Sequence, residues 1–413
     1  MRRLVPTQIF GVTLVLAIVL APAPAAAQLP PTVPLPPTPA PTPPPSSGVL
    51  QAQRVLALGV RLPLRGLGVT PNARVTIELR RRGKWRRLAS RKAAANGRYR
   101  LRVRLPRRAR AYRLRAVAPG AAPSRSIRVR TRAVTLDAVG DINLGDGVAD
   151  VMRFRGTRFP WSGVRHELRG ADIAFGNLEC AVSTRGQKVP NKLYNFLESP
   201  AALKQVGAYA GMDVLNLANN HSGDFGTTAL LDTLSWVKRF GMTSVGAGRG
   251  LSAAARPRVI NRFGLRVGFV GFSDINPAGF VAEPRRPGTL PADPGLVRRA
   301  VRRAARRADV VVATFHWGVE RATRPNRRQG ALARAAFAGG ADAVIGAHPH
   351  VLQPVRRRGR RVVAYSLGNF VWAAGSGITS RTGILKLRLS TRGVERARLL
   401  PARISSTRPA LSR

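Results

Sequence analysis

Short apolar runs alternate with amphipathic segments from residue 133 onwards. The runs TLDAVGD, IAFGNLE, VLNLANNH, VVVATFHWGVE and AVIGAHPH are rich in Val, Leu and Ile, which is typical of strands buried on both faces. Between and after these runs, the spacing of apolar positions predicts helices at 227–240, 296–307 and 327–338. Strands alternating with helices over this length predict one large α/β domain.

A different pattern occupies residues 49–131, where apolar and basic residues alternate, as in RVTIELRRRGKWRRLA and GRYRLRVRLP. Alternation with a period of two predicts strands with one buried and one solvated face. Turn signals at Pro71-Asn72, Asn96-Gly97 and Pro119-Gly120 separate these strands. The pattern predicts a small β-sandwich similar to the immunoglobulin-like modules of exported bacterial enzymes. Its outward arginines either solvate and protect the strands or grip an anionic polymer.

The N-terminus has the pattern of an export signal. Arg2 and Arg3 precede an apolar stretch at 9–21, and Ala25-Ala26-Ala27 forms a cleavage site before Gln28. We therefore expect residues 1–27 to be a signal peptide and the protein to lie outside the cytoplasm. An uncleaved membrane anchor is the alternative. Residues 28–48 are rich in proline, which favours a semi-rigid polyproline II linker.

The 413-residue chain is strongly basic, with 70 Lys+Arg against 19 Asp+Glu and a formal net charge of +51. Nucleic-acid binding, attraction to an anionic polymer or surface, and a plain bias of composition all fit such a charge. The arginines are spread over every segment and lack a clustered aromatic platform, so no nucleic-acid partner is expected.

Candidate chemistry gathers where the predicted strands end. Asp141, Glu179, His221 and His316 follow or close apolar runs, as do His348 and His350. The carboxyl ends of strands in open α/β sheets carry the chemistry, so these side chains should meet at one edge. Carboxylates, amides and imidazoles without thiolates suit hard-to-borderline divalent metals. A lone histidine is more often a core residue, which fits His166 in its helix-like stretch.

Six motifs then occur in the order VGDINLG, FGNLE, ANNHSGDFG, FHWGVE, GAHPHVLQPV and YSLGNF. This series resembles the capsule synthesis protein CapA family, which is tied to poly-γ-glutamate capsules and is similar to calcineurin-like metallophosphoesterases. The resemblance covers about residues 133–400. It implies a sandwich of mixed β-sheets flanked by helices over 132–405, followed by a tail at 406–413.

The resemblance also implies residue roles. The expected cofactor is a divalent metal, as two ions of Mn, Fe or Zn, although Asn143 stands where the related D-x-H motif has a histidine and one site could be weak. His221 would meet the leaving oxygen, and Glu320 would orient His316 or act as a base. Asn143, Asn177, Asp224 and Asn369 are candidates for supporting the site or touching substrate. The implied metal ligands are Asp141, Glu179, Asn220, His316, His348 and His350.

Three functions are consistent with the sequence. The first is a metal-dependent hydrolase or transferase acting on an exported anionic polymer such as poly-γ-glutamate, within or beside a membrane capsule-synthesis complex. The second is an extracytoplasmic phosphoesterase. The third is a polymer-binding or tethering protein without catalysis.

We predict that the mature chain begins at Gln28, because the positive, apolar and small-residue regions are arranged as a cleavable signal. N-terminal sequencing of protein from the cell-envelope fraction measures this. Membrane-embedded protein that retains Met1 would instead establish an anchor.

Overall fold

The computed structural model describes residues 47–412. The predicted signal peptide and nearly all of the proline-rich linker lie outside these residues. These described residues cluster as one compact unit. Within the described part of the chain, no helix combines the length and the apolar character needed to cross a bilayer.

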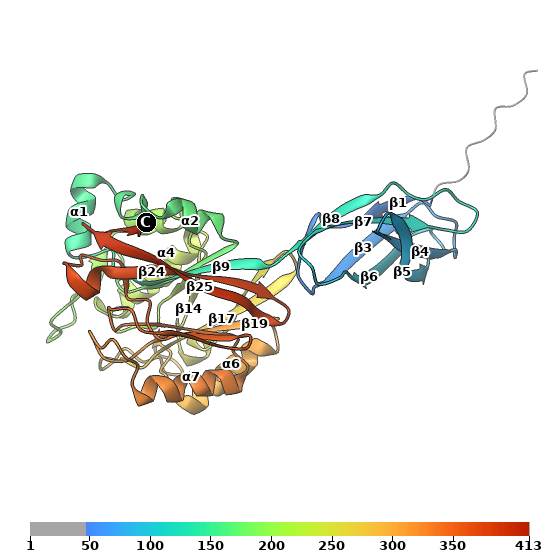
Figure 1. Cartoon of the computed structure of the whole chain (residues 1–413). Helices are drawn as coiled ribbons and strands as arrows, with labels where there is room; N and C mark the ends of the chain where they lie inside the picture. Colours follow the sequence, from blue (N-terminus) through green and yellow to red (C-terminus); the bar gives the residue numbers. More distant parts are fainter. Residues whose placement is uncertain (1–46, 413) are drawn as a thin grey trace, which may run out of the picture. The chain divides into compact units, whose positions relative to one another are not determined.

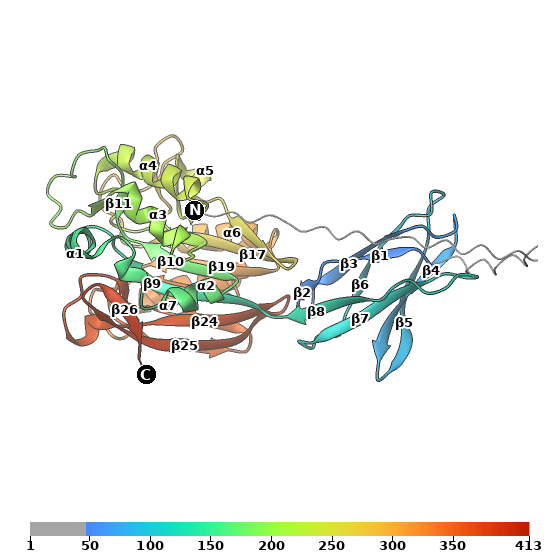
Figure 2. The ribbon, with the colours of Figure 1, turned by 90° about the horizontal axis from the view of Figure 1, so that it is seen from above.

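Two mixed β-sheets form the framework of the region after residue 133. The strand order of the eight-stranded sheet is β14 (Thr243–Val245), β13 (Val214–Asn216), β10 (Ile173–Leu178), β9 (Val134–Ile142), β24 (Arg381–Ser390), β25 (Gly393–Ser405) and β26 (Arg408–Leu411), with β23 (Asn369–Val371) also paired to β9. The six-stranded sheet has the order β16 (Arg258–Arg262), β17 (Leu265–Ser273), β19 (Val310–His316), β20 (Ala343–Ala347), β22 (Arg361–Ala364) and β21 (Val355–Arg358). Figure 2 shows β9 between β10 and β24.

The two sheets pack face to face through alternate side chains of their strands. Phe175 of β10 stacks on Phe269 of β17, with ring centroids 6.0 Å apart. Leu136 of β9 and Val312 of β19 belong to the same buried cluster. Because successive side chains of a strand point to opposite faces, the other half of each strand is left for helices to cover.

Helices cover both outer faces, which gives a four-layer α/β sandwich (Figure 1). The eight-stranded sheet is covered by α1 (Gly147–Arg155), η1 (Phe159–Trp161), α2 (Arg165–Gly170), α3 (Pro200–Ala208) and α4 (Gly226–Arg239). The six-stranded sheet is covered by α5 (Leu251–Ala254), α6 (Pro294–Ala305) and α7 (Arg327–Gly339). The mixed-sheet α/β architecture is confirmed, and the helices predicted at 227–240, 296–307 and 327–338 match α4, α6 and α7 within two residues at each end. The assignment to calcineurin-like metallophosphoesterases stays a prediction.

Aspartates at the strand entrances tie neighbouring strands together. A carboxylate just before one strand accepts the backbone N–H of the strand beside it, at distances of 2.8 to 2.9 Å. The four pairs are Asp172 with Thr135, Asp213 with Ala174, Asp309 with Arg266, and Asp342 with Val311. These carboxylates lie at the edge opposite the strand ends that carry the histidines, and their role is structural.

Residues 47–132 form two further sheets around a separate apolar cluster (Figure 2). One has the order β1 (Val49–Gln51), β3 (Arg61–Leu67) and β6 (Tyr99–Arg104). The other has the order β2 (Val55–Ala57), β8 (Ile127–Arg132), β7 (Ala111–Val117), β4 (Arg74–Arg81) and β5 (Lys84–Lys92). Its immunoglobulin-like character and its ability to fold alone stay predictions.

The tail predicted at 406–413 is wrong for Arg408–Leu411, which forms β26 and pairs antiparallel with β25. Ser406 and Thr407 both have positive φ, 46° and 68°, and make the hairpin turn between the strands. Segment 408–411 is basic and contains a proline, so it has no strand signal of its own. Its pairing with β25 stabilises it as an edge strand.

We predict that Asp172→Ala destabilises the protein by roughly 1–3 kcal/mol, because it removes the acceptor for the Thr135 backbone N–H and the partner of Arg132. Chemical denaturation measures the loss. The matched control is Asp150→Ala, which breaks an exposed pair with Arg153 and should cost less than about 0.5 kcal/mol. Equal losses in the two variants would contradict the structural role of Asp172.

Candidate metal centre

The candidate site residues lie at the carboxyl ends of parallel strands in both sheets. In the eight-stranded sheet, β9, β10 and β13 run parallel and end at Asp141, Glu179 and the 219–221 segment. In the six-stranded sheet, β19 and β20 run parallel and end at His316 and the 348–350 segment. Because both sheets deliver their strand ends to one edge, residues from distant parts of the chain come together there.

Two buried carboxylates form the middle of the site. Asp141 and Glu179 are completely buried, and each places an oxygen within 4.8 Å of a ring nitrogen of His316 and of the other carboxylate. The Asn177 amide donates to Asp141 at 2.8 Å and approaches the His316 Nδ1 atom at 3.2 Å. Asn216 in turn donates to the Asn177 side-chain oxygen at 2.8 Å, so a chain of amides fixes the orientation of these groups.

A glycine contact positions Asp141. A Cβ atom on Gly140 would lie only 1.8 Å from the Gly368 carbonyl oxygen, so the two backbones touch directly. The Asp141 N–H donates to that same carbonyl at 2.9 Å, and β23 pairs with β9 at this point. The contact brings Asn369 to the site, where its side-chain oxygen lies 2.8 Å from the His350 Nδ1 atom.

His316 presents its Nε2 atom to the carboxylates. This nitrogen lies 3.3 Å from Glu179 Oε1 and 2.7 Å from Asn220 Oδ1. Glu179 Oε1, Asn220 Oδ1 and His316 Nε2 thus form a compact set of donor atoms from three strand ends. The sequence had predicted that Asn220 and His316 meet at this site.

His348 and His350 also join the site, from the loop after β20. Glu179, His348 and His350 offer three ligand atoms within 4.8 Å of one another. The two rings lie on the same side, with centroids 5.8 Å apart, although the backbone that carries them is not extended. His348 has φ 95° and His350 has φ 57°, so both backbones are left-handed. For a non-glycine residue this conformation costs about 1–2 kcal/mol, which the surrounding contacts must offset.

Burial and mutual repulsion control the protonation of the site. Burial, together with the charge of Asp141, raises the pKa of Glu179 well above its ordinary value. Burial would also raise the pKa of Asp141, but its interactions with His350 and Asn177 outweigh this and lower it. Burial and neighbouring imidazoles lower the pKa of His316, and that of His348 to about 4. Without a cation, these shifts favour the protonated form of Glu179 and the neutral forms of His316 and His348.

These donors fit a divalent metal. Two buried polar atoms, Glu179 Oε1 and His348 Nδ1, have no hydrogen-bond partner among the described residues. Neutral imidazoles and carboxylates are the forms in which these side chains bind metal, and a cation would displace the Glu179 proton. One set of donors is Glu179, His348 and His350, and the other is Asp141, Glu179 and His316. The two sets share Glu179, as a carboxylate between two ions would require.

His221 forms a separate triad with two charged side chains. Its Nδ1 atom lies 2.7 Å from Asp224 Oδ2 and 3.0 Å from the Lys192 ammonium, which also pairs with Asp224 Oδ1 at 2.7 Å. A proton on Nδ1 would serve the contact to Asp224, and the Lys192 ammonium would then pair with Asp224 and not donate to the ring. Among residues 47–412 nothing hydrogen-bonds to Nε2, which leaves this atom for a substrate. Asp224 therefore orients His221 as well as shaping the loop, where it accepts the Phe196 N–H.

Lys192 is a site residue that the sequence did not reveal. It lies 29 residues before His221, in the segment between β11 (Ala181–Val182) and β12 (Leu197–Glu198), where no periodic pattern marks it. Its side chain is only 16% exposed.

Aromatic rings line the same end of the site. Phe196 is buried and stacks on the His221 ring at 4.2 Å, so its role is to hold that histidine. Trp372 contacts both Phe196 and His350, at centroid distances of 5.7 and 4.6 Å. Tyr194 is exposed and lies 6.5 Å from Phe196. These rings limit the approach to the histidines.

Two of the predicted site residues, Asn143 and Glu320, lie at the edge of the site. The side-chain oxygen of Asn143 accepts the Gly145 N–H at 2.8 Å, which engages it in the loop after β9. Glu320 is exposed, and its charge adds to the raised pKa of Glu179, for which burial and Asp141 are the larger causes. It also adds to the raised pKa of His350, where burial acts in the opposite direction and Asp141 and Asn369 outweigh it. Within the described part of the chain no hydrogen bond or ion pair joins Glu320 to His316, so its catalytic role stays a prediction.

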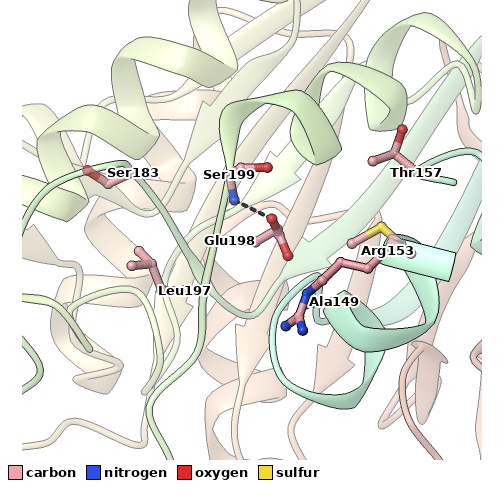
Figure 3. A pocket seen from close by; sticks show the side chains of 8 residues that line it. Ala149, Arg153, Thr157, Ser183, Leu197, Glu198 and Ser199 are labelled. Carbon is pink, nitrogen blue, oxygen red and sulfur yellow. Dashed lines mark hydrogen bonds between the residues drawn. The ribbon is translucent and has the colours of Figure 1, made fainter.

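A surface pocket of about 390 Å³ lies apart from these residues (Figure 3). Glu198 in this pocket accepts the Ser199 N–H, and Arg153 reaches in from α1. It is lined by Ala149, Met152, Arg153, Thr157, Ser183, Leu197, Glu198 and Ser199, none of which is a candidate ligand.

Comparison with known proteins agrees with the sequence motifs. Residues 135–374 match the sequence model of the bacterial capsule synthesis protein family PGA_cap. The PGA biosynthesis protein CapA of Bacillus subtilis (strain 168) is 36% identical over 277 residues, 66% of this chain and 72% of that protein. The capsule biosynthesis protein CapA of Bacillus anthracis is 33% identical over 282 residues, 67% and 69% of the two chains.

Among solved structures, the 5'-nucleotidase precursor from Thermus thermophilus matches 67% of this chain and 56% of that chain. The identity is 12% and the TM-score 0.40, a likeness too distant to bear on the chemistry.

Loss of a residue that only supports a metal ligand lowers metal affinity roughly 10- to 100-fold. We predict that Glu179→Gln and His316→Ala each lower it by more than this, because both residues would be ligands themselves. Elemental analysis after dialysis measures bound metal, and melting in chelator measures metal-free stability, which should change little. His166→Ala is the matched control and should retain metal, because His166 is exposed on α2 and is not the core residue that the sequence predicted. Collapse of metal-free stability would show that Glu179 and His316 hold the fold instead.

Glu179→Gln should also change how the metal-free stability depends on pH. Because the pKa of Glu179 is higher in the folded protein than its ordinary value of 4.5, metal-free stability should fall as pH rises from about 4.5 through the raised pKa. Glu179→Gln should remove this fall, and added divalent metal should oppose it in the wild type.

Proposed function

Because the chain belongs to the bacterial capsule synthesis protein family PGA_cap, we propose that it is a metal-dependent hydrolase or transferase acting on an anionic polymer such as poly-γ-glutamate. The observation that carries the proposal is the convergence of carboxylate, amide and imidazole donors at one edge of two sheets. We further propose that it acts outside the cytoplasm after removal of residues 1–27.

Asp141, Glu179, Asn220, His316, His348 and His350 would hold the metal, as one or two ions of Mn, Fe or Zn. When bound, the metal supplies Lewis acidity and charge compensation at an amide or phosphoryl oxygen. Asn177 and Asn369 keep the ligands oriented through their hydrogen bonds to Asp141 and His350.

His221 performs proton transfer at its Nε2 atom. Asp224 holds the Nδ1 proton and fixes the ring, and Phe196 stacks on its face. Burial lowers the pKa of His221 although Asp224 opposes this, so the neutral ring accepts a proton from the attacking group and then returns it to the leaving atom. Lys192 places a positive charge beside this transfer and would attract a carboxylate of the substrate.

The two alternatives differ in what metal-loaded protein does. Incubation with poly-γ-glutamate and with an aryl phosphate, each at low and high salt, separates them. Shortened or transferred polymer chains support the proposal. Phosphate release with an unchanged polymer would replace it by a phosphoesterase, and binding of polymer without turnover under any metal would replace it by a tethering protein.

We predict that His221→Ala lowers turnover about 10²- to 10⁴-fold while metal content stays within about twofold, because His221 moves a proton without being a ligand. Steady-state assays and elemental analysis on the same samples measure both quantities.

Asp224→Asn is the companion variant. It keeps the size of the side chain but weakens the contact that fixes the ring, so turnover should lie between wild type and His221→Ala. His166→Ala should retain full turnover. Equal loss of metal and of turnover in His221→Ala would make His221 a ligand and would contradict the assigned role.

A further inference from the structure

The outer face of the sheet β1-β3-β6 carries arginines in register across two strands. Arg61 pairs with Arg104 and Arg65 with Arg100, and Arg102 lies opposite Pro63. All five arginines are exposed, and the intervening Leu62, Leu64 and Val103 are buried in the cluster beneath. We name Arg61, Arg65, Arg100, Arg102 and Arg104 the arginine face.

No carboxylate among residues 47–412 pairs with the arginine face. Elsewhere, arginines near strand entrances are paired, as Arg262 is with Asp213 and Arg266 with Asp309. Residues 47–132 contain 25 Lys+Arg but a single acidic residue, Glu78, which pairs with Arg115 on the other sheet. The positive charge of the arginine face is therefore uncompensated.

Apolar groups border these charges. Val49 and Leu67 are opposite each other on β1 and β3, and both are exposed, at 51% and 45%. On β6 the side chains of Arg100, Arg102 and Arg104 therefore leave the backbone about 6.4–6.8 Å apart, beside a small apolar strip. Guanidinium groups pair with carboxylates through two parallel hydrogen bonds. A flexible chain with regularly repeated carboxylates and methylene groups matches both features.

We propose that the arginine face binds an acidic polycarboxylate chain, independently of the metal centre. The five arginines lie outside residues 135–374, so this surface is additional to the part of the chain that matches the family. The choice of poly-γ-glutamate as the polymer rests on the proposed function. Binding through this sheet would retain the polymer near the protein whether or not the metal centre acts on it.

The test compares two variants of the full mature chain with equal charge. One replaces the five residues of the arginine face by Gln. The matched control replaces five exposed arginines on and just after α6 by Gln: Arg298, Arg299, Arg302, Arg303 and Arg306. Fluorescence anisotropy with labelled poly-γ-glutamate in chelator measures affinity without turnover, over a range of salt concentrations.

We predict that the arginine-face variant binds poly-γ-glutamate at least about tenfold more weakly at ~0.1 M salt, and with a shallower salt dependence. The α6 variant should lose less than about threefold. Replacing the same five arginines by Lys should give intermediate affinity, because the charge remains and the paired hydrogen bonds do not. If the Gln variant fails to fold, the Lys variant and Arg102→Glu make the same comparison.

Equal loss in the arginine-face and α6 variants would overturn the proposal in favour of diffuse charge. Tighter binding of single-stranded DNA, or of phosphatidylglycerol vesicles, than of poly-γ-glutamate would overturn it in favour of a nucleic-acid or membrane surface. Binding that depends on the arginine face, without turnover by metal-loaded protein, would support this inference while contradicting the proposed function.

Discussion

Two carboxylates buried within 4.8 Å of each other are the constraint on which the rest of the site depends. Like charges at this separation and burial cannot both ionise unless a cation compensates them. The surrounding groups follow from this requirement. Asn177 and the His348 backbone N–H donate to Asp141, which stabilises one charge, while Glu179 is left with an oxygen that no described group satisfies. The neutral imidazoles beside it add ligand atoms and no further negative charge.

The sequence predicts this arrangement where local pattern and global topology agree. The mostly apolar runs ending in Asp141, Glu179 and His316 form buried strands, and parallel strands bring their ends to one edge. The helix α7 is recognisable from its periodicity, and the structure adds a capping box between Asn326 and Gln329 at its start. The interactions of the aspartates before the strands are equally local, because each carboxylate needs only a backbone N–H from the neighbouring strand.

What could not be predicted depends on backbone twist and on distant partners. The left-handed conformations of His348 and His350 are set by the packing of the loop after β20, and a histidine in a sequence does not predict such a conformation. Lys192 reaches His221 from a segment without periodicity, so only the folded loop shows the contact. The strand β26 exists because β25 pairs with it. The module at 47–132 was predictable from its alternation, whereas the register that aligns its arginines across β3 and β6 was not.

The pairing of β9 with β23 and β24 has a consequence for the order of assembly. β9 is the first strand of the region after residue 133, yet its partners on one side are supplied by residues 369–371 and 385–389. Until those residues have been added, Asp141 lacks half of its supporting sheet and His350 lacks Asn369. Contacts this far apart in sequence form late in folding. A metal ion at this site would therefore be acquired by the completed chain, in whichever compartment that chain finishes folding.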